Sequence, residues 1–263
     1  MKLVTWNVRN GGRPAPQADR LSKIEPDVIA LQEIQTSTAG PWADSLERYG
    51  YIVETTADLI GEQRYGVLVA SKWPIERLPT RGVEVPYPAR FMSALVSPAT
   101  VPPFELHCTH VPDGSGHGWR KVEHFEGLYR HLVRPSERSR ILCGDFNSPR
   151  AEWPDSTVVT WAEEEDGHKL RRDRGQRWDA AERSILLGLE PFGLRDAFRE
   201  CHGYGRADSE DQKSWFTRDG RGRRFDHVLA PPHWAVEHAE YLHEWRRQGL
   251  SDHAPLLVCL QPA

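Results

Sequence analysis

The stretch ILCGDFNSP, residues 141–149, combines an apolar run of strand length with two polar side chains spaced two residues apart. In a strand, residues i and i+2 point to the same side, so Asp145 and Asn147 are expected to lie together at its end while Phe146 faces the opposite way. Two polar groups directed at one point indicate a functional site. The alternative is a strand followed by an ordinary turn, because Asp, Asn, Ser and Pro all favour turns.

Short apolar runs recur along the chain and predict a protein rich in β-structure. Most of them contain β-branched or aromatic residues and are bounded by Gly, Pro or Asp, which favours strands over helices. The predicted strands are LVTWNV (3–8), DVIALQEI (27–34), YGVLVASK (65–72), SALVS (93–97), FELHCTHV (104–111), RILCGDF (140–146), RFDHVLA (224–230) and PLLVCL (255–260).

Helical patterns lie between some of these strands. The clearest is the segment 117–134, while residues 17–25, 41–49 and 179–190 are weaker candidates. In the segment 117–134 the apolar residues fall three or four apart and form one stripe: Trp119, Val122, Phe125, Leu128 or Tyr129, and Leu132. Strands mixed irregularly with helices imply layers of sheet and helix rather than a regular βαβ repeat. With 263 residues and no internal repeat or linker, the chain is predicted to form a single domain, residues 1–263, of the α/β class.

Composition narrows the function classes. The formal net charge of -4 argues against a protein that coats nucleic acid or anionic membranes non-specifically, although it permits a local basic groove. No stretch has 18 consecutive apolar residues, so no membrane-spanning segment is expected. The polar segment 163–177 balances five acids with five bases and is interpreted as a solvated insertion. A reducing, cytoplasmic location is expected because the cysteines lack zinc-like spacing and mostly lie in apolar runs: Cys108, Cys143, Cys201 and Cys259.

Polar residues with catalytic or ligand chemistry lie at the ends of six of these apolar runs. Taken singly, each has an ordinary explanation as a turn residue, a cap or a satisfied core side chain. Taken together they indicate one site, because sheet folds place their sites at strand ends. The set is Asn7, Glu33, His110, Asp145, Asn147, Asp226, Asp252 and His253.

The residue types fit metal-assisted hydrolysis of a phosphodiester. Glu33, Asp252 and Asn7 offer hard oxygen ligands, too few for a full protein cage, which suits a magnesium ion that keeps several waters. Asp145 is suited to take a proton from an attacking water, and Asn147 to hold that water or a phosphoryl oxygen.

The histidines supply the remaining chemistry. One or both would donate a hydrogen bond or a proton to the phosphoryl oxygen in the transition state. Asp226 is suited to fix the tautomer and orientation of one imidazole.

The ordered series WN, QE, TH, GDFN, RFDH and SDH resembles the endonuclease/exonuclease/phosphatase superfamily. Its members include pancreatic-type deoxyribonucleases, abasic-site endonucleases, sphingomyelinases and inositol-polyphosphate 5-phosphatases. The resemblance spans Asn7 to His253, and GDFN with a downstream SDH is specific in combination. It implies an α/β (α+β) fold, a four-layer sandwich of two mixed β-sheets packed face to face with helices outside. It also implies a divalent-metal phosphoesterase that uses Mg²⁺, with Mn²⁺ as the alternative ion.

The resemblance assigns metal and nucleophile roles by motif. Glu33 would be the principal metal ligand, with Asn7 and Asp252 in or next to the metal shell. Asp145 and Asn147 of GDFN would activate and orient the nucleophile.

The remaining motifs imply phosphate contacts. His253 would contact the phosphate with Asp226 as its orienting partner, and His110 would lie beside the same phosphate. Abasic-site endonucleases carry an acid two residues after the first-strand Asn, whereas this chain has Arg9, as in the deoxyribonuclease-like branch. Arg9 would therefore bind substrate, which argues against an abasic-site repair role. Trp215 of KSWFT resembles the Trp-containing segment that precedes the penultimate motif, and it is a second candidate for substrate binding.

The substrate itself is less well defined. The stretch TRDGRGRR, residues 217–224, carries a charge of +3 from four Arg and one Asp. Its Arg224 is expected to bind substrate, either along a phosphate backbone or on a polyphosphorylated small molecule, and a solvated loop is the alternative. The leading hypothesis is a nuclease acting on DNA or RNA. The alternative is a phosphoesterase for an inositol-phosphate-like or sphingomyelin-like substrate, and a non-catalytic binding module is least favoured because the catalytic set is complete. The sequence does not indicate an oligomeric state.

Overall fold

The computed structural model describes residues 1–79 and 82–262, and two six-stranded sheets dominate it. The first sheet runs in the order β15-β16-β1-β2-β4-β3 and the second in the order β11-β14-β8-β7-β6-β5. The first sheet consists of β1 (Lys2–Asn7), β2 (Val28–Ile34), β3 (Ile52–Thr55), β4 (Gly66–Ser71), β15 (Trp234–Tyr241) and β16 (Leu256–Pro262). The second consists of β5 (Ile75–Arg77), β6 (Phe91–Val96), β7 (Phe104–His110), β8 (Arg140–Asp145), β11 (Arg195–Asp196) and β14 (Asp226–Ala230).

Each sheet is mixed and carries a parallel pair at its centre. In the first sheet β1 lies parallel to β2, and in the second β7 lies parallel to β8, with His110 opposite Asp145. The other neighbours are antiparallel, including β14 and β8, where Asp226 lies opposite Asp145. Parallel strands end at the same edge of a sheet, so this topology gathers the polar strand ends.

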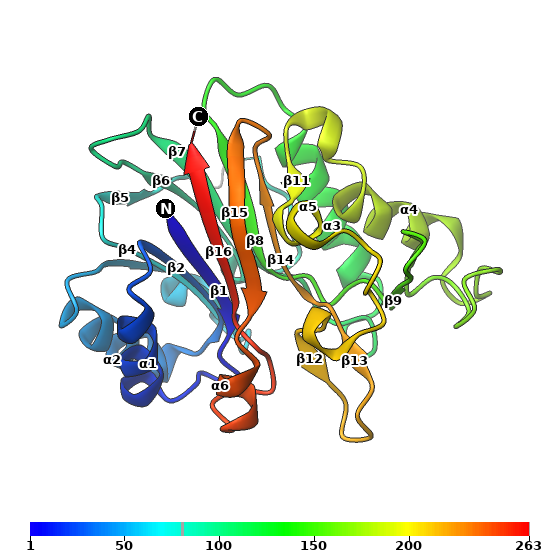
Figure 1. The fold of residues 1–263 in the computed structure, drawn as a ribbon, viewed down its shortest axis with the longest axis horizontal. Helices are drawn as coiled ribbons and strands as arrows, with labels where there is room; N and C mark the ends of the chain where they lie inside the picture. Colours follow the sequence, from blue (N-terminus) through cyan, green and yellow to red (C-terminus); the bar gives the residue numbers. More distant parts are fainter. Residues whose placement is uncertain (80–81, 263) are drawn as a thin grey trace.

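Helices cover the outer face of each sheet (Figure 1). The first sheet is covered by α1 (Pro14–Ile24) and α2 (Thr36–Glu47), and the second by α3 (Arg120–Leu132) and α4 (Gly175–Leu186). Between the sheets lies a buried core that includes Leu3, Val28, Leu106, Cys143 and Val258. The predicted four-layer arrangement of two mixed sheets with helices outside is therefore confirmed.

The stripe predicted on the third helix is buried as expected, except at its first member. Val122, Phe125, Leu128 and Leu132 are fully buried in the layer between α3 and the second sheet. Removing a ring such as that of Phe125 from this layer would cost about 3–5 kcal/mol. Trp119 precedes the helix and is 43% exposed, so its assignment to the apolar stripe is wrong.

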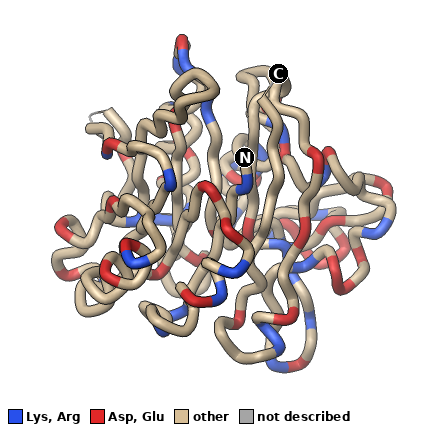
Figure 2. Tube along the Cα trace, turned by 60° about the vertical axis from the view of Figure 1, so that its left-hand side comes forward, with Lys and Arg blue, Asp and Glu red and all other residues tan. Residues whose placement is uncertain are grey.

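Smaller elements fill the ends of the sandwich. These are α5 (Ala197–His202), α6 (His243–Arg247), the hairpin of β9 (Ala151–Glu152) and β10 (Val158–Val159), the hairpin of β12 (Trp215–Phe216) and β13 (Gly222–Arg223), and 3₁₀ turns at Ala57–Leu59, Pro88–Arg90, Glu190–Phe192 and Glu210–Gln212. Acidic and basic residues are interspersed over the chain rather than collected on one face (Figure 2). Among the described residues, no helix combines the length and apolarity needed to cross a membrane.

Candidate active site

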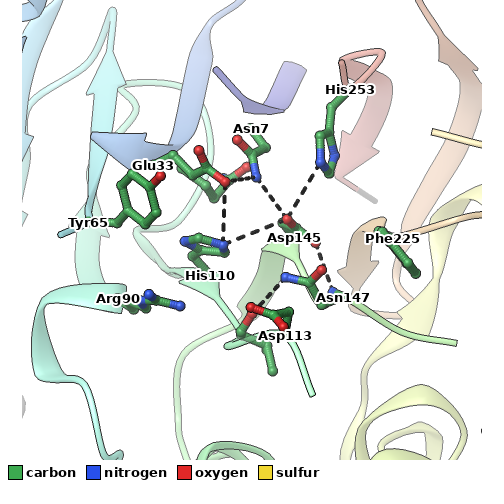
Figure 3. Close-up of polar contacts among 12 residues, drawn as sticks. Asn7, Glu33, Tyr65, Arg90, His110, Asp113, Asp145, Asn147, Phe225 and His253 are labelled. Atoms are coloured by element: carbon green, nitrogen blue, oxygen red, sulfur yellow. Dashed lines mark hydrogen bonds and ion pairs between the residues drawn. The ribbon is translucent and has the colours of Figure 1, made fainter. Parts of the chain in front are cut away.

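Asp145 is the hub of a polar cluster where the central strands of the two sheets end (Figure 3). Its Oδ2 accepts a 2.8 Å hydrogen bond from Asn7 Nδ2 at the end of β1, and its Oδ1 accepts one of 2.8 Å from the backbone N–H of Asn147. His110 Nε2 and His253 Nε2 lie 3.8 and 3.9 Å from Asp145 Oδ2. The structure thus brings together strand ends that are far apart in the sequence.

Gly144 allows the GDFN motif to approach the neighbouring strand. Its φ is 137°, and an added Cβ would collide with the carbonyl oxygen of Thr109 on β7. Asn147 also has a positive φ, 50°, and its Nδ2 donates 2.9 Å to the carbonyl oxygen of Val111. Asp145 and Asn147 therefore lie on one side, as predicted, although Asn147 has already left the strand.

Glu33 leaves the regular pattern of its strand. The register of β2 against β4 shifts between Gln32 and Ile34, and Glu33 has a φ of 64°. Its carboxylate accepts hydrogen bonds from the backbone N–H of Asn10, 2.6 Å, and from Asn7 Nδ2, 3.1 Å. A bulge of this kind re-aims a side chain, and here it directs Glu33 toward the hub.

Asn7 acts as a bridge between two carboxylates. Its Nδ2 donates to both Glu33 and Asp145, while its Oδ1 accepts 3.0 Å from the backbone N–H of Arg9. The opposite amide orientation would place Nδ2 against an N–H donor, so this network fixes it. Because Asn7 Oδ1 already accepts this hydrogen bond, Asn7 is better suited to orient a metal ligand than to bind the metal itself.

The donor set fits a divalent cation that keeps part of its water shell. Glu33, Asp145 and Asp252 all line one cavity of about 390 Å³. Their carboxylate oxygens are hard ligands of the type that Mg²⁺ and Mn²⁺ accept. Asp145, Asp226 and His253 also approach one another within 4.8 Å, but a hydrogen bond already joins Asp226 to His253. A cation would therefore be held from the cavity side, by Glu33 first.

His253 and Asp226 form the predicted pair. Asp226 Oδ2 lies 2.7 Å from His253 Nδ1, and both side chains are buried. Burial alone would lower the pKa of His253, but Asp226 and Asp145 outweigh it and raise the pKa to about 10. The imidazole is therefore held as a cation whose Nε2–H points toward Asp145 and the cavity.

His110 has the opposite electrostatic environment. Burial, followed by the charges of Arg90 and His253, holds the pKa of His110 well below its usual range, so the ring is neutral. Its Nδ1 has no hydrogen-bond partner among the described residues, whereas its Nε2 lies 4.0 Å from Glu33 Oε1 and 3.8 Å from Asp145 Oδ2. Because an unpaired buried N–H is costly, the proton belongs on Nε2, facing the two carboxylates.

Asp145 is tuned by the same surroundings. Burial raises its pKa to about 7, an effect that the cation on His253 opposes and the carboxylate of Asp226 reinforces. A carboxylate whose pKa lies near neutrality is well matched to accepting a proton.

The three residues expected to bind substrate lie in different surroundings. Arg9 is exposed beside the cavity, with its Nε 3.8 Å from Asp252 Oδ2. Trp215 lines the cavity, stacks on Phe225 at 5.3 Å and donates 3.4 Å to Asp252.

Arg224 does not reach the site, so its assignment to substrate binding is corrected here. It is buried in ion pairs with Glu152, 2.7 Å, and with Asp196, 2.8 Å. A guanidinium held by two carboxylates has no donor geometry left for a phosphate.

The cavity also contains residues that the sequence reading missed. Three of them directly precede strands, Tyr65, Arg90 and Phe225, and three lie in loops, His117, Trp161 and Arg174; no motif in the sequence assigned any of them to the site. Arg90 is buried and lies between the rings of Tyr65, 5.6 Å, and Tyr87, 5.0 Å. The PAR motif preceding a strand carried no signal that would have singled it out.

Several known proteins resemble this chain in sequence and in fold. Exodeoxyribonuclease III of Haemophilus influenzae is 26% identical over 97% of this chain and 98% of its own length. An AP endonuclease from Archaeoglobus fulgidus shares the fold with a TM-score of 0.73 and 23% identity, covering 99% of both chains. A 3' phosphatase from Neisseria, solved bound to product DNA hairpin, gives a TM-score of 0.70 and 22% identity, also covering 99% of both chains. The model of the Endonuclease/Exonuclease/phosphatase family matches residues 4–253, so the chain belongs to that family.

Proposed function

We propose that this protein is a Mg²⁺-dependent phosphodiester hydrolase that acts on DNA. The observation that carries the proposal is the arrangement around Asp145, which lies within 4 Å of two histidines, one cationic and one neutral, in a cavity shared with Glu33. The names of the exodeoxyribonuclease, the AP endonuclease and the DNA-bound phosphatase support DNA as the substrate.

Asp145 is assigned to the nucleophile. Its carboxylate would accept the proton of the attacking water, and Asn147, fixed by its bond to Val111, would orient that water. A divalent cation bound by Glu33 and Asp252 would polarise the phosphoryl oxygen. Asn7 would keep Glu33 and Asp145 apart and aligned through its two N–H bonds.

The histidines are assigned to the phosphoryl oxygens. His253, protonated and oriented by Asp226, would donate its Nε2–H as negative charge develops in the transition state. His110 would donate from Nε2 as a neutral ring. Arg9, exposed at the rim, would bind the flanking part of the substrate.

The test is a substrate panel with the purified protein in Mg²⁺, Mn²⁺ or excess chelator. The panel holds single-stranded and duplex DNA, duplex DNA with an abasic-site analogue, RNA, bis-p-nitrophenyl phosphate and inositol phosphates. We expect cleavage of DNA that requires a divalent cation and that Asp145→Asn abolishes. Full activity in chelator would contradict the metal assignment. Faster hydrolysis of inositol phosphates would contradict the substrate assignment, and preference for the abasic duplex would contradict the interpretation of Arg9.

A further inference from the structure

Three arginines from separate segments surround the indole of Trp161. The guanidinium carbons of Arg150, Arg174 and Arg223 lie 5.8, 5.9 and 5.9 Å from its ring centroid. Arg150 follows the GDFN loop, Arg174 lies within the polar segment 163–177, and Arg223 lies on β13. The fold thus assembles a cationic cluster that no single stretch of the sequence displays.

This cluster is poorly neutralised by the protein. Among the described residues, no carboxylate lies within 4 Å of Arg150 or Arg223, and Arg174 meets only the exposed Asp173, at 3.8 Å. Arg150 contacts the carbonyl oxygen of Glu163, whose carboxylate is held by an ion pair to another arginine. Burial lowers the pKa of Arg174 and of Arg223, and the charge of Arg150 lowers both further. Nearby acids oppose the shift, Asp173 and Glu182 for Arg174 and Glu165 and Asp219 for Arg223.

A fourth cation near Trp161, Lys121, has a buried carboxylate partner. Lys121 also lies near Trp161, at 5.7 Å, but it is fully buried against Glu182, 3.4 Å away. Its charge is neutralised within the protein, whereas among the described residues Arg150 and Arg223 have no carboxylate partner and Arg174 has only the exposed Asp173. Three guanidinium groups around one ring repel one another, and a bound anion would relieve that repulsion.

The cluster is connected to the reaction centre. Trp161 Nε1 donates 2.9 Å to the carbonyl oxygen of Asn147, and Trp161 and Arg174 line the cavity that contains Asp145. A row of aromatic rings runs from the arginine cluster to the cavity. Trp161 lies 6.5 Å from Phe225, which stacks on Trp215 at 5.3 Å. An anion at Trp161 would therefore belong to the same ligand as the scissile phosphate.

We propose that Arg150, Arg174 and Arg223 form a subsite for a second phosphate group of the substrate. The inference rests on the proposed function and specifies the substrate class as one that carries a phosphate next to the scissile one, as a nucleic acid strand does. Guanidinium groups match phosphate oxygens with paired N–H donors. The three guanidinium groups gather around one indole ring, so the cluster suits a single phosphate rather than a long backbone track.

The experiment combines charge removal on the protein with charge removal on the substrate. Oligonucleotides carry one neutral methylphosphonate at successive positions flanking the cleaved bond, and kcat/KM is measured for wild type, Arg223→Gln and Arg150→Gln. The matched control is Arg218→Gln, which removes an exposed arginine from the same hairpin. Melting temperatures show whether each variant is folded.

On the unmodified strand we expect Arg223→Gln to lower kcat/KM by roughly 10–100-fold, the range for a charge-assisted contact. At one flanking position the methylphosphonate should lower kcat/KM of the wild type by a similar factor. At that position it should not lower kcat/KM of Arg223→Gln any further. Arg150→Gln should behave in the same way, and Arg218→Gln should match wild type. Independent, multiplying losses at every position for both cluster variants would overturn the subsite.

Two small-molecule substrates show whether a failed test counts against the subsite or against the proposed function. Bis-p-nitrophenyl phosphate has one phosphate, so wild type and Arg223→Gln should hydrolyse it equally. If wild type hydrolyses neither it nor DNA, the proposed function fails, whereas a loss on it in Arg223→Gln overturns only the subsite. Inositol bisphosphate turnover that depends on Arg223 would support the subsite and identify a phosphorylated polyol as its source.

Discussion

Asp226 Oδ2 lies 2.7 Å from His253 Nδ1, and the opposite ring nitrogen of His253 lies 3.9 Å from Asp145 Oδ2. The three side chains are buried and come from β14, the loop before β16, and β8. One carboxylate therefore orients the imidazole from behind, while the other faces it across the cavity. Asp226 and Asp145 therefore lie on opposite sides of one imidazole and have different roles.

The pair can be tested by a double-mutant cycle. His253→Ala should lower the rate by about 10²–10⁴, the usual range for a positioned acid or base. Asp226→Asn should cost less alone, and its effect should largely vanish in the double mutant because residues acting as a unit are non-additive. Turnover and melting temperature are measured together. Additive losses in turnover would mean that Asp226 does not act through His253.

A second prediction concerns Glu33 and its partner Asn7. Glu33→Gln should nearly abolish activity and weaken Mn²⁺ binding, measured by electron paramagnetic resonance, because an amide replaces the principal carboxylate. Asn7→Ala should weaken binding by roughly 10–100-fold, the effect of losing an outer partner of a metal ligand. Glu164→Gln, an exposed change, serves as the control. Unchanged Mn²⁺ affinity in Glu33→Gln would place the cation elsewhere.

The sequence predicted the strands and the polar residues at their ends because both follow from local patterns. Apolar runs bounded by turn residues marked the central strands, and parallel pairing of β1 with β2 and of β7 with β8 then brought their ends together. The edge strand β15 was missed because Glu237, His238 and Glu240 are exposed to solvent and interrupt its apolar residues. The cytoplasmic location stays a prediction.

Pairings between loops could not be predicted in this way. Arg224 looked like a phosphate ligand because its neighbours in sequence are basic, but Glu152, 72 residues away, holds it in the interior. Conversely, Arg174 lies in a segment of balanced charge that resembled a solvated insertion, yet it lines the cavity. The partner of Arg224 is distant in sequence, and in neither case does local composition show where the side chain lies.

A third prediction concerns Lys121 behind the catalytic loop. It is fully buried, donates 2.7 Å to the carbonyl oxygen of Asn147 and pairs with Glu182. Lys121→Met should lower the free energy of unfolding by roughly 3–5 kcal/mol, because it leaves a buried carboxylate without its cation. Urea unfolding measures this, with the exposed Lys169→Met as control. Equal stability of the two variants would contradict the buried pair.

The last prediction concerns the buried ion pairs that Glu152 forms with Arg224 and Arg199. Glu152 accepts hydrogen bonds from Arg224, at 2.7 Å, and from Arg199, at 2.8 Å. Burial by itself would raise the pKa of Glu152, but the two arginines outweigh it and lower the pKa from 4.5 to about 2. The carboxylate therefore stabilises the fold fully above pH 4.5, and this contribution is lost as the pH falls toward 2.

Glu152→Gln should accordingly cost roughly 3–5 kcal/mol at pH 7, because two buried guanidinium groups lose their shared carboxylate. The difference from wild type should shrink as the pH falls below about 4.5, since the unfolded wild-type chain then takes up a proton on Glu152 that the folded side chain does not accept until the pH nears 2. Urea unfolding at pH 7, 5, 4 and 3 measures it, with Glu200→Gln, an exposed partner of Arg195, as the control. A difference that stayed constant down to pH 3 would show that the charge on Glu152 does not stabilise the fold and that Arg224 is held there by packing alone.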